Sequence, residues 1–72
     1  MPSIDLAHAI YHVLRHALPS GAGIRVYPVD SRMVACVTDR PRTAIVALLR
    51  VGYDVSVETG RIAVRAINAT NS

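Results

Sequence analysis

The stretch AIVALLRV, residues 44–51, decides the fold because it repeats the stretch AIYHVLRH at residues 9–16. Four of the eight aligned positions are identical, and both stretches place apolar residues at the spacing of one helical face. Each stretch is followed by two runs that are rich in β-branched residues. The pattern predicts an αββ unit that occurs twice and suggests an internal duplication. Chance similarity in a chain rich in alanine and valine is the alternative.

The first predicted helix runs from Ile4 to Leu18, with Ser3 as its N-cap and Asp5 at the positive end of its dipole. The second follows the residues TDRPR: Thr38 or Asp39 caps it, Pro41 lies in its first turn and Gly52 ends it. The side chains expected to face the core are Leu6, Ile10, Val13, Leu14 and Ala17 in the first helix and Ile45, Leu48 and Leu49 in the second.

Each helix precedes a predicted hairpin, at residues 24–37 with the turn Asp30-Ser31 and at residues 53–67 with the turn Thr59-Gly60. A two-residue turn fixes the cross-strand partners. The predicted pairs on the helix side are Pro28–Met33, Val26–Ala35, Ile24–Val37, Val57–Ile62 and Val55–Val64. The predicted pairs on the other side are Val29–Arg32, Tyr27–Val34, Arg25–Cys36, Glu58–Arg61, Ser56–Ala63 and Asp54–Arg65.

These elements predict an α+β fold with the order αββαββ. The expected architecture is a two-layer sandwich, in which a four-stranded antiparallel sheet carries both helices on one face. We expect a single domain over residues 1–67 and a frayed tail over residues 68–72.

A chain of 72 residues with one cysteine, Cys36, builds a marginal core and forms no internal disulfide. We therefore expect a homo-oligomer, most simply a dimer, with a stable monomer as the alternative. No apolar run is long enough to span a membrane, and no cleavable leader is recognisable. These features predict a cytoplasmic protein without a membrane partner.

An apolar surplus marks the expected interface, because small monomers rarely expose contiguous apolar patches. It comes from the uncovered face of the first hairpin and from the second helix, which is apolar most of the way round. The residues predicted to form it are Tyr27, Val29, Val34, Cys36, Val46 and Val51. The alternative is that a curled strand or the C-terminal segment covers the surplus.

Eight arginines and no lysine give a net charge of +3 with neutral histidines, which raises the possibility of nucleic-acid binding. Arg61 and Arg65 face carboxylates across the second hairpin, so other arginines must supply phosphate contacts. Those residues, with two threonines at the start of the second helix, are Thr38, Arg40, Arg42, Thr43, Arg25 and Arg32. The alternative at this helix start is that Asp39 neutralises one arginine and the other points into solvent.

Three histidines at positions 8, 12 and 16 lie on one face of the first helix. Asp5, His8 and His12 are the candidate metal ligands, and a solvated polar face is the alternative. Cys36 has no base nearby in the sequence, and no motif of a nucleophile or a phosphate-binding loop occurs. We therefore expect no enzyme activity and no cofactor, with another protein or nucleic acid as the partner besides a second copy.

Overall fold

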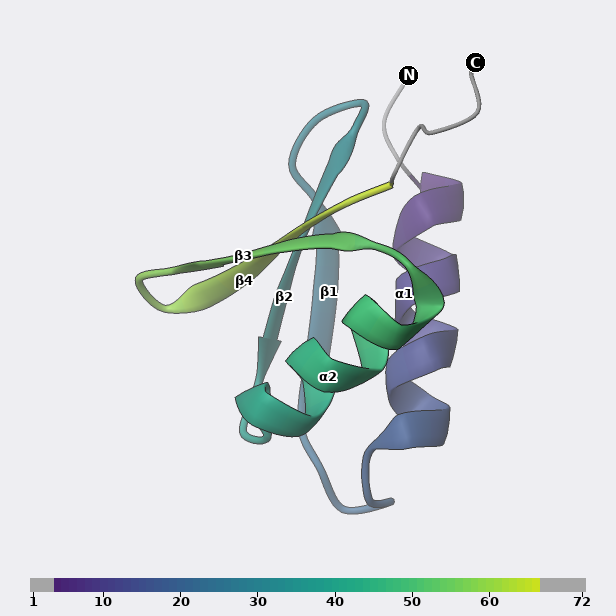
Figure 1. Cartoon of the computed structure of the whole chain (residues 1–72), viewed down its shortest axis with the longest axis vertical. Helices are drawn as coiled ribbons and strands as arrows, with labels where there is room; N and C mark the ends of the chain where they lie inside the picture. The colour runs from purple at the N-terminus through teal and green to yellow at the C-terminus, as the bar shows by residue number, and fades with distance from the viewer. Residues whose placement is uncertain (1–3, 67–72) are drawn as a thin grey trace.

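The computed structural model describes residues 4–66, so Ser3 and the tail at 68–72 lie outside the described residues. The elements are α1 (Ile4–Ala17), β1 (Ile24–Pro28), β2 (Met33–Thr38), α2 (Pro41–Val51), β3 (Asp54–Glu58) and β4 (Arg61–Arg65). This αββαββ order and the α+β sandwich confirm the predicted fold class (Figure 1). The internal duplication stays a prediction.

The four strands form one antiparallel sheet in the order β1-β2-β4-β3. The second strands of the two halves, β2 and β4, pair at its centre, and β1 and β3 form its edges. α1 packs against β1 and α2, and α2 also contacts β2 and β3. Both helices therefore cover the same face of the sheet, while its other face is open (Figure 1). None of the helices in residues 4–66 has the length and apolar character that a membrane span requires.

The core lies between the helices and the two central strands. Its largest fully buried side chains are Ile10 and Leu14 of α1, Leu48 of α2, Val34 and Cys36 of β2, and Val64 of β4. Burying an aliphatic side chain of this size stabilises the fold by about 1.5–3 kcal/mol. The helical spacing predicted the buried positions of α1 and α2 correctly, but two residues that it placed in the core, Ala17 of α1 and Leu49 of α2, are exposed.

The start of α2 differs from the prediction, because neither Thr38 nor Asp39 caps it. Arg40 is the N-cap residue, and no side chain in the described part of the chain accepts a capping hydrogen bond from the first turn. The Asp39 carboxylate instead accepts a hydrogen bond of 3.0 Å from the N–H of Gly23, and Thr38 Oγ1 accepts one of 3.1 Å from the N–H of Arg40. Asp39 thus ties the start of α2 to the loop before β1.

The end of α2 is the predicted one. Gly52 has φ 111°, a left-handed conformation that glycine adopts without strain. Its N–H donates to the carbonyl oxygens of Leu48 and Leu49, which closes the last turn.

The second hairpin has the predicted register, with Val57 opposite Ile62 and Asp54 opposite Arg65. The first hairpin does not: Tyr27 pairs with Ala35 and Val26 with Cys36, one residue away from the prediction. A shift of one residue turns every side chain of a strand to the opposite face.

The physical reason for the shift is the side chain of Asp30. Its carboxylate accepts hydrogen bonds from the N–H groups of Arg32 (2.7 Å) and Met33 (2.9 Å). The N–H groups of Val29 and Asp30 both donate to the carbonyl of Met33. These bonds close a four-residue loop, 29–32, in place of the predicted two-residue turn.

Candidate interaction surfaces

The register shift removes two residues from the predicted interface. Val34 and Cys36 are fully buried and belong to the core beneath the helices. Their assignment to an interaction surface was wrong, because it rested on the two-residue turn. Burial also raises the pKa of the Cys36 thiol to about 11, so the group is protonated at neutral pH and is a poor nucleophile.

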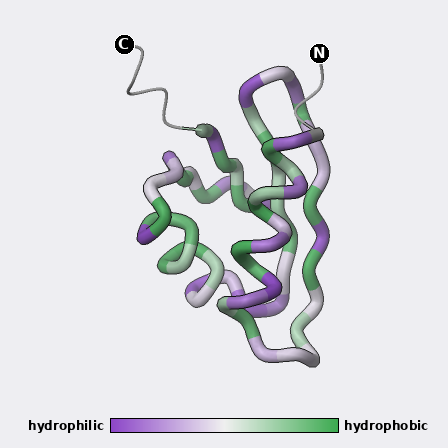
Figure 2. Tube along the Cα trace, turned by 90° about the vertical axis from the view of Figure 1, so that its right-hand side faces the viewer, coloured by the Kyte–Doolittle hydropathy of each residue, from purple (hydrophilic) through white to green (hydrophobic). Residues whose placement is uncertain are grey.

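The other four predicted interface residues are exposed, but they do not form one surface. Tyr27 lies on the open face of the sheet, where it pairs with Ala35 and its hydroxyl interacts with Arg61. Val29 lies in the loop after β1. Val46 and Val51 are 53% and 57% exposed on α2. Hydrophobic positions therefore surround much of α2, including its side away from the sheet (Figure 2).

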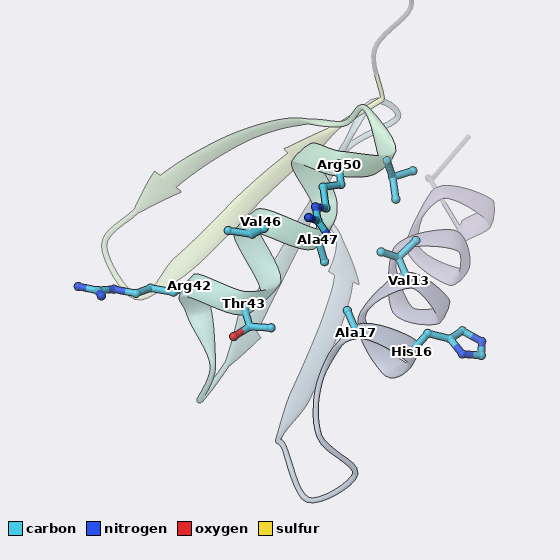
Figure 3. A pocket seen from close by; sticks show the side chains of 9 residues that line it. Val13, His16, Ala17, Arg42, Thr43, Val46, Ala47 and Arg50 are labelled. Carbon is cyan, nitrogen blue, oxygen red and sulfur yellow. The ribbon is translucent and has the colours of Figure 1, made fainter.

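An apolar groove of about 790 Å³ lies between α1 and α2. Within residues 4–66, its lining comes from the two helices: Val13, His16 and Ala17 of α1, and Arg42, Thr43, Val46, Ala47, Arg50 and Val51 of α2. Figure 3 shows Val13 and Ala17 on one side of the groove and Ala47 on the other, with Arg50 running down between the helices. Arg42 and His16 extend outward from opposite sides.

The charged side chains that line this groove are all basic. Among the described residues, its lining contains two arginines and one histidine and no carboxylate. Five of its nine lining residues are aliphatic: Val13, Ala17, Val46, Ala47 and Val51. The groove thus combines a mainly apolar lining with positively charged side chains. Of its lining, the sequence predicted Val46 and Val51 as interface residues but placed Val13 and Ala17 in the core.

A second exposed apolar region lies at the β3 edge of the sheet. Val57 of β3 is 71% exposed, the largest value among the large apolar side chains described. Leu49 lies on the flank of α2 opposite Ala47 and Val51, and β3 contacts α2. The sequence placed both residues on the helix-covered side. The sequence did not reveal the exposure of Val57, because this exposure follows from the place of β3 at the edge of the sheet and of Val57 near the hairpin turn.

The cross-strand charge pairs have the predicted positions. Arg61 Nε donates a 2.8 Å hydrogen bond to Glu58 Oε1, and this bond, followed by the one with Tyr27, raises the pKa of Arg61. The register also sets Asp54 opposite Arg65, although these two side chains form no ion pair in the described structure.

The predicted phosphate-binding residues are only partly brought together. Arg40, Arg42 and Thr43 lie at the start of α2, where Thr38 already bonds to Arg40. Arg25 lies on the open face of the sheet, opposite Val37. Arg32 precedes β2, so it is separated from the start of α2 by the whole strand, about 20 Å.

The histidine row is exposed along α1. Across residues 4–66, no group of three or more histidine, cysteine, aspartate or glutamate side chains is arranged to hold a metal ion. The predicted ligand set of Asp5, His8 and His12 therefore has no support from the structure.

Comparison of the chain with models of protein families, with curated proteins and with solved structures gives no match.

Proposed function

We propose that the protein is a non-enzymatic interaction module that forms a homodimer through the free edge of β3 and the adjoining flank of α2. The exposure of Val57 on a strand that is paired on one side only is the observation that carries this proposal. A free strand edge offers backbone groups that a second strand can bond, and an apolar side chain there adds buried area on pairing.

The backbone of β3 is suited to pairing. Glu58 and Arg61 flank the two-residue turn, so residues 54, 56 and 58 bond to β4, while the N–H and C=O groups of Val55 and Val57 point to the free edge. β3 contains no proline and no lysine, two devices that protect edge strands. The opposite edge strand, β1, carries Pro28 and is packed against α1.

The charges of β3 select the register of the dimer. A two-fold axis at Ser56 would place Asp54 opposite Glu58 of the second copy, and like charges that face each other destabilise a strand pair. An axis at Val57 places the two Val57 side chains together and sets Glu58 opposite Ser56. The proposed dimer has this second register.

The test uses Val57→Lys with Val29→Lys as the matched control. Wild-type protein should sediment at twice the 7.8 kDa mass of one chain, and Val57→Lys at the monomer mass, because two lysines would meet on the axis. Val29→Lys adds the same charge at an exposed loop and should leave the dimer intact. Sedimentation velocity on dilute and concentrated samples measures this. A wild-type protein that stays monomeric throughout, or a control that dissociates equally, would contradict the proposal.

Nucleic-acid binding through Arg40, Arg42, Arg25 and Arg32 is the second candidate, and it has less support because these arginines are spread over three regions. A protein that contacts several phosphates at once loses affinity steeply as salt rises. We expect titration of duplex DNA to give no binding with such a salt slope. A steep slope that Arg40→Ala and Arg42→Ala reduce would favour this candidate over the interaction module.

A further inference from the structure

We propose that the groove between α1 and α2 binds an acidic amphipathic helix of another protein. This surface is separate from the β3 edge, so the inference goes beyond the proposed homodimer and does not depend on it.

The shape and the charge of the groove point to this partner. Two helices with aliphatic residues on their facing flanks form a trough, which accepts the apolar face of a third helix. Arg42 and Arg50 lie along the same helix, eight residues apart, so they follow the direction of the trough. Carboxylates on the flank of a bound helix that faces α2 would reach them and form charge-assisted hydrogen bonds.

A second copy of the chain does not fit this groove. A two-fold contact would bring together four arginines and two histidines without a carboxylate from the same surface. Like charges in an interface cost affinity. The partner must therefore supply the negative charge.

A lipid surface fits less well than a helix. Membrane-bound surfaces present their apolar side chains outward into the lipid. Here the apolar side chains of Val13, Ala17 and Ala47 line the inside of a trough (Figure 3). A partner has to enter the trough to bury them.

The length of α2 sets the length of the partner. Eleven residues span about 16 Å, which corresponds to about three turns of a bound helix. Anchoring side chains at positions i, i+3 or i+4, and i+7 of such a helix would occupy the aliphatic floor.

The experiment uses a synthetic helical peptide of about 14 residues, with leucines at this spacing and glutamates on both flanks. Titration into the full-length wild-type chain should give saturable binding that weakens in high salt. The amide resonances of groove residues such as Val13, Ala47 and Val51 should shift. A scrambled peptide of the same composition should bind at least tenfold more weakly, because its leucines no longer share a face.

Charge reversal separates the groove from a general charge effect. Arg42→Glu with Arg50→Glu should lower the affinity at least tenfold, whereas the matched pair Arg25→Glu with Arg32→Glu, outside the groove, should change it less than twofold. A peptide with lysines in place of the glutamates should bind the first variant better than wild type. Val57→Lys should bind the acidic peptide as wild type does, even if dimerisation fails.

The proposal is overturned if the peptide does not bind, if both charge-reversal pairs weaken binding equally, or if the resonance shifts map to the open face of the sheet. It is also overturned if vesicles containing anionic lipid bind through Arg42 and Arg50 while the acidic peptide does not.

Discussion

Val34→Glu is expected to prevent folding, whereas Val37→Glu, three residues along the same strand, is expected to leave the protein folded. Val34 is fully buried on the face of β2 that the helices cover, and Val37 is 37% exposed on the open face of the sheet. Circular dichroism, amide NMR spectra and urea titration of the two variants provide the measurement.

The two substitutions differ in their expected cost relative to the free energy of unfolding. Placing an unpaired carboxylate in the core costs several kcal/mol, and loss of the packed valine adds to it. A domain of 72 residues has a free energy of unfolding of about 4–11 kcal/mol, so the substitution removes most or all of it. At position 37 the new carboxylate faces Arg25 across the strands, and we expect a change of about 1 kcal/mol or less.

The pair also tests the register of the first hairpin. The two-residue turn expected from the sequence would put Val34 outside and Val37 inside, and would reverse the result. A folded Val34→Glu protein together with an unfolded Val37→Glu protein would show that the register with Val26 opposite Cys36 is incorrect.

The sequence predicted the second hairpin correctly and the first one incorrectly for a physical reason. In β4 the apolar Ile62 and Val64 alternate with Arg61 and Arg65, so the buried face is evident from the pattern. In β2 the residues from Met33 to Val37 are all apolar, and such a run gives no preference between the two registers. The register of β2 therefore depends on the loop before it, where the Asp30 carboxylate accepts hydrogen bonds from the N–H groups of Arg32 and Met33.

The two candidate surfaces were only partly predictable for a related reason. The apolar excess of α2 was visible in the sequence and led to Val46 and Val51. The groove is also lined by Val13 and Ala17, whose helical spacing is equally consistent with a position in the core. Helical spacing alone does not show where the second helix packs against the first. The exposure of Val57 depends on the strand order, in which β3 is outermost.

Cys36 is expected to lower the free energy of unfolding at high pH and to have no pH-dependent effect on it near neutral pH. Burial raises its pKa from 9.0 to about 11 in the folded state, because the thiolate would lie in the apolar core. Between these values the unfolded chain releases the proton and the folded chain retains it. The contribution of the thiol is therefore fully present below pH 9 and is lost as the pH rises towards 11, at about 1.4 kcal/mol per pH unit.

The measurement compares urea unfolding of the wild type and of Cys36→Val from pH 7 to pH 11 in about half-unit steps. Valine keeps the site apolar and cannot ionise, so the difference between the two curves isolates the contribution of the Cys36 thiol. The difference should be constant below pH 9 and should then change by about 2–3 kcal/mol, with the wild type losing stability.

Alkylation of native Cys36 at pH 8 should accordingly be slower than in urea-unfolded protein by a factor of about 100 or more, since each pKa unit lowers the thiolate fraction tenfold. Parallel stability curves together with rapid native alkylation would mean that the thiol is accessible to solvent, and β2 would then have to carry Cys36 on the open face of the sheet.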